Sequence, residues 1–311
     1  VERRNTIPIL SNVKFDAPDG QLSLNATDMD IDIVETVPAD VASPGSTTAP
    51  AHTLYDIVRK LPEGAQVELD CTGDDSQLTL SAGRSKFKLT CLPTEDFPVL
   101  SGGDLPNSFT LTAAELRGLV DRTRFAISTE ETRYYLNGIY LHAADGHRLA
   151  SVDLPLPAGA EGMPGVIVPR KAIAEIRKLI DETEDDIAIS LSDTKIKFAF
   201  EGTVLTSKLI DGTFPDYDRV IPEGNDKVLE VDTHAFAEAV DRVSAISTEK
   251  SRAVKLTISK GNLTLSANSP DNDTATEEVP VEYDETEIEI GFNSRYLLDI
   301  AQQIEGDTAR F

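Results

Sequence analysis

A short stretch that occurs twice in this chain constrains its fold more than any other feature. Residues 125–133 read FAISTEETR and residues 244–252 read SAISTEKSR, so both contain Ala-Ile-Ser-Thr-Glu and end on arginine. Each copy follows an amphipathic segment that contains Asp-Arg, and each leads into alternating, strand-like sequence. The copies lie about 120 residues apart, which is too long for a solenoid repeat and is the size of a whole domain. The sequence therefore predicts a duplicated domain.

Five segments of the chain carry the spacing of an amphipathic helix. Their apolar residues recur at intervals of three and four, which places them on one helical face. The segments are 51–61, 113–124, 170–180, 233–243 and 293–304. A stretch rich in Pro, Gly and Ser, 43–50, is predicted to be a loop that leads into the first helix.

The helices and the strand-like runs between them fall into three copies of one unit. We place the domains at 1–107, 108–228 and 229–311. The first unit lacks the helix that opens the other two, and the third ends soon after its second helix. Both ends of the chain are therefore expected to be incomplete.

The net charge of −25 is distributed unevenly along the chain. The five predicted helices are together neutral to basic, so the acidic residues belong to strands and loops. Taken alone, so acidic a composition argues against a nucleic-acid partner. Helices that share one surface could still face a polyanion and make weak, salt-sensitive and sequence-independent contacts, although chance could also produce so small an excess.

The composition indicates a soluble protein of the cytoplasm. No signal peptide is visible, and no apolar run approaches the roughly 18 residues that a membrane span needs. Two cysteines, Cys71 and Cys91, are too few for a disulfide framework and are expected to be buried thiols in a reducing compartment.

Groups that could catalyse a reaction or bind a metal are few, and no cofactor, metal or catalytic residue is predicted. Asp28, Asp30 and Asp32 alternate, so they should share one strand face, and a solvated outer face is favoured over a metal site. Residues 271–273 are predicted to be a hairpin turn, because the Gly and Glu of a calcium loop are missing. Two alternatives stay open at this point: a metal-dependent hydrolase using Asp28, Asp30 and His147, and an acidic structural spacer module.

Residues 145–150, with the sequence DGHRLA, are the one stretch outside the repeats that has unusual chemistry. In one interpretation they form a turn followed by a strand. In the other they form a site, where Gly146 lets another chain approach while His147 and Arg148 donate hydrogen bonds beside Leu149.

Five motifs, taken in chain order, resemble the bacterial sliding clamp, the β subunit of DNA polymerase III. They are RNTIPILSN at 4–12, RYYLNG at 133–138, DGHRLA at 145–150, FPDY at 214–217 and GFN at 291–293. The resemblance spans essentially the whole chain. It implies an α+β fold with three copies of a two-helix, multi-strand clamp domain, in which helices line the inside of a ring and sheets form the outside. A head-to-tail homodimer would close that ring.

The function that this resemblance implies is that of a non-enzymatic DNA sliding clamp. Such a ring encircles duplex DNA and tethers DNA polymerase III, clamp loader subunits and other proteins that carry a clamp-binding peptide. By resemblance the peptide enters an apolar cleft between the second and third domains. The cleft would be formed by Leu136, Gly146, His147, Arg148, Leu149, Pro215, Arg219 and Val220, with Asn293 and Tyr296 at its edge. Ser251 stands where some relatives have an aromatic residue, so one subsite is expected to be shallower.

The resemblance also implies a dimer seam and a DNA-facing surface. The seam would pair Phe109 and Leu111 of one chain with Ala245 and Ile246 of the other. The side chains expected to approach DNA phosphates are Arg4, Arg84, Lys86, Arg122, Arg177 and Lys178.

Overall fold

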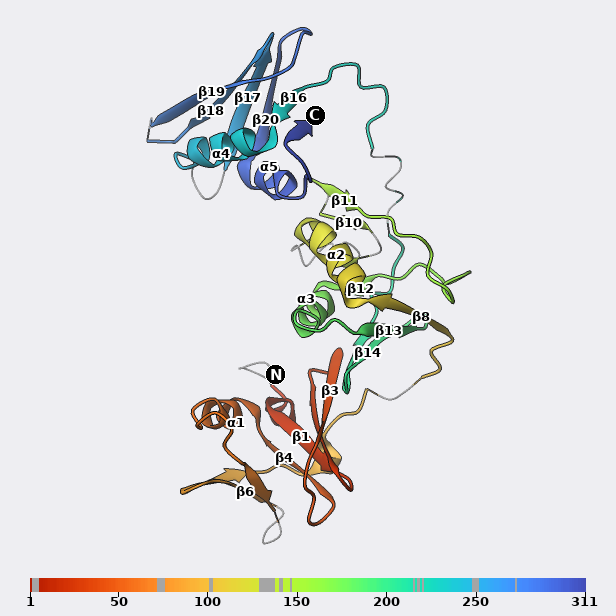
Figure 1. Ribbon diagram of the computed structural model, residues 1–311. Coiled ribbons are helices and arrows are strands. Elements are labelled where there is room, and N and C mark those ends of the chain that lie inside the picture. Colours follow the sequence, from red (N-terminus) through yellow and green to blue (C-terminus); the bar gives the residue numbers. More distant parts are fainter. Residues whose placement is uncertain are drawn as a thin grey trace. The chain divides into compact units, whose positions relative to one another are not determined.

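The computed structural model describes residues 1–311 except 2–5, 72–75, 101–102, 129–137, 140–141, 146, 215, 217–218, 220, 248–251 and 272. At 138–139 and 142–144 it describes the backbone alone. The chain forms two compact units, Val1–Phe214 and Pro215–Phe311, and each is described by itself (Figure 1). In the described residues no helix is long and apolar enough to cross a membrane.

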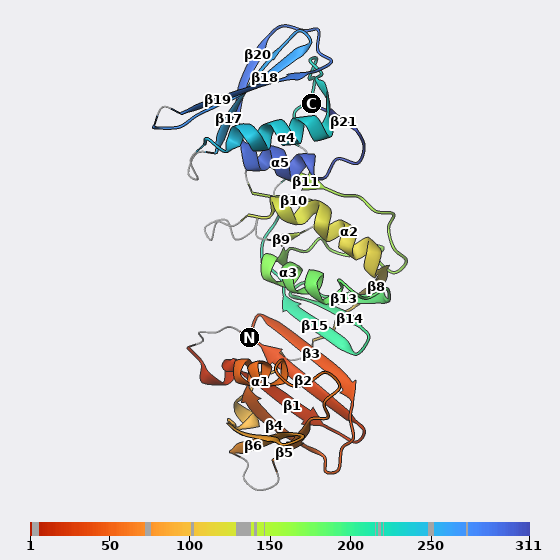
Figure 2. The same cartoon turned by 60° about the vertical axis from the view of Figure 1, so that its left-hand side comes forward.

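One antiparallel sheet of eight strands runs through the whole first unit, in the order β4-β1-β2-β3-β15-β14-β13-β8. Its strands are β1 (Asn12–Ala17), β2 (Gln21–Thr27), β3 (Ile31–Pro38), β4 (Gly45–Pro50), β8 (Asn107–Thr112), β13 (Asp186–Leu191), β14 (Lys195–Phe200) and β15 (Thr203–Lys208). β3 and β15 pair from Thr203↔Glu35 to Ser207↔Ile31 (Figure 2). We call the part before β8 the first lobe and the part from β8 to β15 the second lobe, so the β3–β15 pairing is the join between them.

The first lobe is completed by one helix and a small second sheet. Its other elements are η1 (Pro8–Ser11), α1 (Ala51–Val58), β5 (Glu68–Asp70), β6 (Gln77–Ala82), β7 (Ser85–Thr90) and η2 (Thr94–Asp96). α1 packs Leu54 and Ile57 against a core that contains the buried Cys91 and, at its edge, the half-buried Cys71.

The predicted loop at 43–50 is mostly strand β4, so that prediction was wrong. β4 pairs with β1 along six residues, from Asn12↔Pro50 to Ala17↔Gly45. The buried Thr48 hydroxyl accepts a hydrogen bond from Asn12 Nδ2 at 3.0 Å and donates one to the Leu92 carbonyl at 2.8 Å. These partners lie far away in the sequence, and the strand itself has no apolar alternation that would reveal it.

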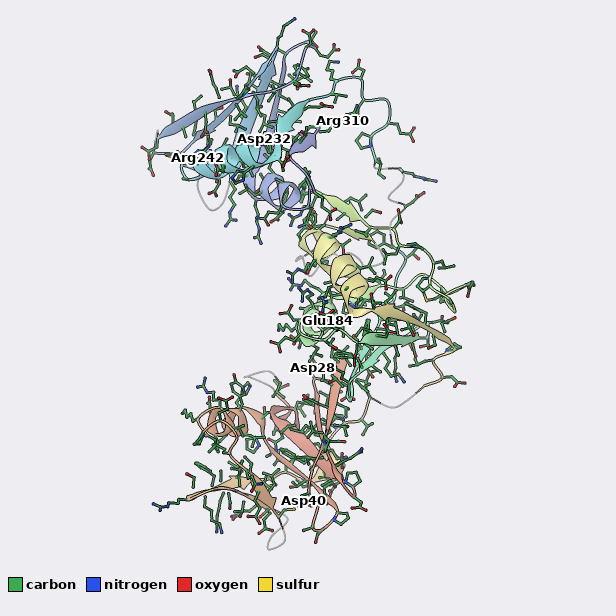
Figure 3. All side chains as sticks on the ribbon, viewed as in Figure 1. Asp28, Asp40, Glu184, Asp232, Arg242 and Arg310 are labelled. Atoms are coloured by element: carbon green, nitrogen blue, oxygen red, sulfur yellow. The ribbon has the colours of Figure 1, made fainter. Side chains whose placement is uncertain are left out.

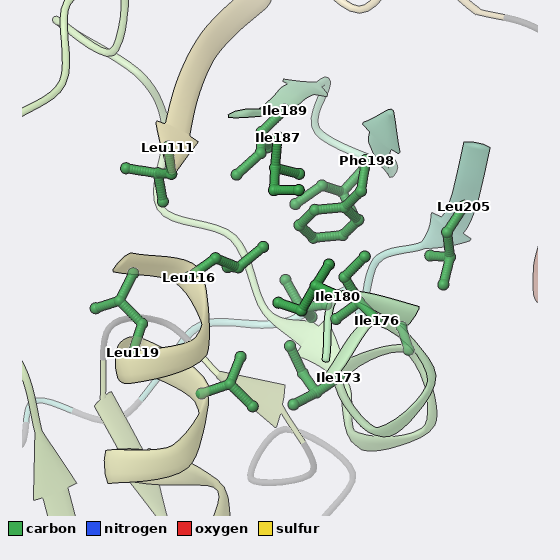
Figure 4. Packing of buried hydrophobic residues seen from close by; sticks show 14 of the residues in the cluster. Leu111, Leu116, Leu119, Ile173, Ile176, Ile180, Ile187, Ile189, Phe198 and Leu205 are labelled. Carbon is green, nitrogen blue, oxygen red and sulfur yellow. The ribbon is translucent and has the colours of Figure 1, made fainter. Parts of the chain in front are cut away.

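The second lobe packs two helices against its part of the sheet. Its remaining elements are α2 (Ala113–Thr123), η3 (Arg124–Ala126), β9 (Gly138–Ile139), β10 (His142–Ala144), β11 (Leu149–Ser151), β12 (Val168–Pro169) and α3 (Arg170–Leu179). α2 begins at a capping box, in which the Thr112 hydroxyl accepts from the Glu115 N–H and the Glu115 carboxylate accepts from the Thr112 N–H. The apolar faces of both helices, with Leu116 and Ile176 among them, meet Ile187 and Phe198 of the sheet (Figure 4).

The second unit repeats the arrangement of two helices on a sheet. Its elements are β16 (Glu230–Asp232), α4 (Thr233–Ser244), β17 (Ala253–Ser259), β18 (Asn262–Asn268), β19 (Thr274–Pro280), β20 (Ile288–Asn293), α5 (Ser294–Ala301) and β21 (Thr308–Arg310). The main sheet has the order β19-β18-β17-β20, and β16 pairs with β21. Asp232 begins α4 by accepting from the Ala235 N–H at 2.7 Å. The described residues of 271–273 join β18 to β19, as the predicted hairpin turn requires. All five predicted helices therefore form, with small shifts at their ends.

Candidate functional sites

The turn before β11 is held by the Asp145 carboxylate. Its Oδ1 accepts from the backbone N–H groups of His147 and Arg148 at 2.9 and 3.0 Å, and its Oδ2 accepts from Arg148 Nε at 3.0 Å. The guanidinium of Arg148 also lies over the Phe125 ring, 5.4 Å from its centroid. The described residues of 145–150 therefore form a turn followed by the strand β11, as one of the two interpretations predicted. The contacts fix the backbone on which His147 is exposed and Leu149 is half-buried.

The predicted cleft residues divide between the two units. His147, Arg148 and Leu149 are consecutive in the second lobe, whereas Arg219, Asn293 and Tyr296 belong to the second unit. Asn293 begins α5 and accepts from the Arg295 N–H at 3.0 Å, and Arg219 is an exposed residue that pairs with Asp216 at 2.8 Å. The predicted cleft residues outside the described part of the chain are Leu136, Gly146, Pro215 and Val220. The cleft as a whole stays a prediction.

Arg177, predicted to approach DNA phosphates, is bound to two carboxylates of its own chain. Its Nε donates to both oxygens of Asp121 at 2.9 and 3.0 Å, and a terminal nitrogen donates to Asp181 Oδ1 at 2.7 Å. These hydrogen bonds outweigh burial and raise the pKa of Arg177 above its ordinary value. Since Asp121 lies on α2, the pair ties α2 to α3, and the charge of Arg177 is already neutralised.

Arg177 and Asp181 also line a groove of about 460 Å³ that carries further cations. Arg124, Arg170 and Lys178 line it with exposed side chains, while the buried Ile127 and Ile173 form its floor. Lys178 contacts Glu175 at 2.9 Å, and Arg124 contacts Asp121 at 3.2 Å. Of these three cations, Lys178 alone was predicted from the sequence to face DNA. The signal for the other two was the basic composition of 113–124 and 170–180, which does not say where each side chain points.

The other predicted DNA-facing residues lie apart from this groove. Arg84 and Lys86 are exposed on the hairpin that joins β6 to β7 in the first lobe, and Arg122 is exposed on α2. Arg4 lies outside the described residues.

Two residues of the predicted dimer seam lie on β8 and face the core of the second lobe. Leu111 is only 8% exposed and belongs to the core of the second lobe, and Phe109 packs against the same core (Figure 4). Side chains that face inward leave little surface for another chain, so their burial argues against this half of the seam. On the other half, Ala245 is exposed and Ile246 is half-buried just after α4.

Asp28, Asp30 and Asp32 do not share a solvated strand face, so that prediction was wrong. Asp28 and Asp30 lie in the turn between β2 and β3, where Asp28 pairs with Lys171 and Asp30 pairs with Lys208 at 3.0 Å (Figure 3). Burial raises the pKa of Asp28, but hydrogen bonds from Lys171 and from the backbone of Ile31 and Asp30 outweigh it and leave that pKa below its ordinary value. Asp32 is buried in β3. In the described part of the chain, no three His, Cys, Asp or Glu side chains come together as a metal site would require.

Comparison with known proteins places these sites in a family. Models of the N-terminal, central and C-terminal domains of the DNA polymerase III beta subunit match residues 1–101, 110–216 and 218–311. The beta sliding clamp of Caulobacter vibrioides is 52% identical over 324 residues, which cover 100% of this chain and 87% of that protein. The clamp of Escherichia coli is 36% identical over 319 residues, covering 99% and 86%.

A solved structure gives the same result. The sliding clamp of Bartonella birtlesii, crystallised with griselimycin, superposes with a TM-score of 0.97 at 51% identity and covers 100% of this chain and 87% of that one. Three clamp domains of mixed helix and sheet thus define a processivity factor of DNA replication rather than an enzyme. The chain belongs to the DNA polymerase III beta subunit family, the beta sliding clamps. Neither the hydrolase nor the spacer alternative is supported.

Proposed function

We propose that this clamp encircles duplex DNA in the cytoplasm as a ring of two chains and tethers DNA polymerase III to it. The observation that carries the proposal is the groove of Arg124, Arg170 and Lys178 beside η3 and α3. Exposed cations above an apolar floor attract phosphates without reading bases, because base edges are not needed for such contacts. A protein whose net charge is −25 holds DNA only loosely through them, which suits a ring that slides.

The groove is tested by removing two of its charges together, with Arg124→Ala and Arg170→Ala. Log affinity falls with log salt concentration, and each lost phosphate contact makes this slope less steep by about 0.9. For binding to a short labelled duplex, the slope of the double variant should therefore be less steep by about two. Lys260→Ala is the control, since Lys260 lies on the turn between β17 and β18 and pairs with Asp284. An unchanged slope would remove the groove from the DNA surface. Encirclement is tested separately: the clamp should stay on a nicked circle and leave once the circle is cut.

For the dimer seam we propose two open sheet edges in place of Phe109 and Leu111. In the described residues β7 is an edge strand with exposed Lys86 and Lys88, and β19 is an edge strand with exposed Glu278. Edge strands of opposite charge are suited to pair between chains.

The second unit supports this choice of edge. Arg242 near the end of α4 donates to Glu277 of β19 at 2.6 Å, so Ala245 and Ile246 follow a helix end that is fixed to that edge.

For the partner cleft we retain the residues that the resemblance implied, around the turn that Asp145 holds. The domain boundaries at 107 and 228 also stay proposals; the first falls at the first residue of β8 and the second just before β16, the strands that lead into α2 and α4.

A further inference from the structure

A buried carboxylate lies at the join between the two lobes. Asp32 is 8% exposed, and its strand β3 pairs with β15 so that Asp32 lies opposite Thr206. On the other side β3 pairs with β2, where Asp32 lies opposite Thr27 and diagonal to Asn25 on the same face of the sheet. A carboxylate buried in this way has lost its hydrating water, so only hydrogen bonds or charges from neighbouring residues can stabilise it.

Two buried acceptors face each other here without a partner. Among the described residues, neither Asp32 Oδ1 nor Asn25 Oδ1 has a hydrogen-bond partner, and both atoms are buried. The Asn25 side chain is the neighbour whose hydrogen bonding lowers the pKa of Asp32, although burial outweighs it. Two facing acceptors cannot bond to each other, and a single proton placed between them would satisfy both. A carboxylic acid and a carboxamide then close a ring of two hydrogen bonds, in which each group donates once and accepts once.

The lysines on this face of the sheet either pair with carboxylates other than Asp32 or are separated from Asp32 by a strand. Lys14, across from Asn25, pairs with Asp16 at 3.0 Å, and Lys208 of β15 pairs with Asp30. Lys195 and Lys197 lie on β14, beyond Lys208 and Thr206 of β15. Glu35 of β3 is three positions from Asp32 and so points to the opposite face. β2 carries no charged residue. In the described part of the chain no ion pair therefore offsets the burial of Asp32.

We propose that Asp32 and Asn25 form a proton-binding site that strengthens the join between the first and second lobes. A proton from solvent binds Asp32 Oδ1, which then donates to Asn25 Oδ1, while Asn25 Nδ2 donates to the other oxygen of Asp32. Protonation satisfies both orphaned atoms and removes a buried charge beside the β3–β15 pairing. Above the pKa of the site the carboxylate is ionised, and the join is weaker. Acidification therefore stiffens this connection of the clamp.

The burial of Asp32 raises its pKa from 3.8 to about 6, against the lowering effect of the Asn25 hydrogen bond. A carboxyl whose pKa is raised on folding stabilises the folded state most at low pH and loses that contribution as pH rises through about 6. When the pH falls from about 7.5 to about 5, protonation of this one site should raise the equilibrium constant for closing of the join about tenfold.

Asp32→Asn is the variant that isolates the site, because an amide keeps the shape and can pair with Asn25 without a proton. Hydrogen exchange of the β3 and β15 amides would be measured in the full chain and the variant at each pH, so that the intrinsic exchange rate cancels. The wild-type protein should lose about tenfold protection relative to Asp32→Asn as pH rises over this range. Parallel pH profiles of the two proteins would overturn the proposal.

Two controls keep the result specific. Asp30→Asn removes an exposed carboxylate from the adjoining turn and should leave the pH response in place. A difference infrared spectrum between about pH 5 and pH 8 should contain a protonated-carboxyl component that is lost in Asp32→Asn and persists in Asp30→Asn. If Asp32→Asn does not fold, Asn25→Leu replaces it; because this variant removes both the amide donor and the amide acceptor beside Asp32, the midpoint of that component should shift. A spectrum that neither Asp32→Asn nor Asn25→Leu changes would refute the site.

Discussion

Arg117 should be the residue through which α2 stabilises the end of α3. One terminal nitrogen donates to the carbonyls of Ile180 and Thr183 at 2.8 and 2.7 Å, and the other reaches the exposed Glu184 carboxylate at 3.3 Å. The last carbonyls of a helix have no partner within it, so a guanidinium from a neighbouring helix is well suited to satisfy them. The Arg117 side chain is 19% exposed, which limits how far water could replace it.

The magnitude follows from these contacts. Hydrogen bonds from a charged donor contribute about 1.5–3 kcal/mol each, and partial exposure reduces the pair at Ile180 and Thr183 to about 2–3 kcal/mol in total. The exposed pair with Glu184 adds at most about 0.5 kcal/mol. Arg117→Met keeps the apolar stem, so its loss should reflect the guanidinium and not the packing of the methylenes.

The assay must be local, because a chain of several domains need not unfold in one step. Hydrogen exchange of the α2 and α3 amides under mild urea should report the loss in Arg117→Met. Arg59→Met is the matched control, since Arg59 is an exposed helical arginine that pairs with Asp56 at 2.8 Å and should contribute little. Equal effects of the two substitutions would refute the role of the α3 carbonyls.

Two predictions test the assigned surfaces. Leu149→Lys should weaken a clamp-motif peptide at least about tenfold in a fluorescence titration, because an ammonium would enter an apolar cleft; Leu156→Lys is the control at a residue that is 65% exposed, and equal affinities would contradict the cleft. Ile246→Lys should raise the dimer dissociation constant in analytical ultracentrifugation by placing an unpaired charge in the seam, whereas Lys60→Glu on the first lobe should not. An unchanged constant in Ile246→Lys would exclude the seam.

The sequence predicted the elements that are determined by residues close together in the chain. The five helices carry their own apolar spacing, and the capping box of Thr112 and Glu115 marks the start of α2 within four consecutive residues. The repeat around Ile127 and Ile246 indicated a duplicated domain, because a copied domain copies its local signals. The Asp145 turn was also visible, since an Asp can accept from backbone N–H groups two and three residues ahead.

What the sequence did not predict depends on partners far along the chain. β4 is a strand because β1 lies beside it, and Thr48 is buried because Asn12 and Leu92 meet it there. Arg177 has the charge of a phosphate ligand, yet Asp121 on another helix already binds it. Leu111 was placed in the seam by resemblance, and its burial in the core depends on neighbours from other elements. In each case the residue type is visible in the sequence, but the residue that it contacts lies far along the chain and cannot be predicted from it.

The join between the lobes shows what such neighbours do to one residue type. Asp28 and Asp32 lie four positions apart, yet hydrogen bonds lower the pKa of the first and burial raises that of the second. A lowered pKa gives stability that is present above the unfolded value, near 3.8, and is lost as pH falls below it; a raised pKa gives the opposite dependence, lost as pH rises through about 6.

Protection of the β3 and β15 amides should therefore pass through a maximum between these limits. Asp28→Asn should weaken the join near neutral pH, because its pair with Lys171 is lost, and should flatten the acid side of the profile while the side above pH 6 remains. The profile is measured by hydrogen exchange against an amide of the second unit as the internal reference. A single slope across the whole range would mean that one of the two carboxylates does not titrate as its surroundings require.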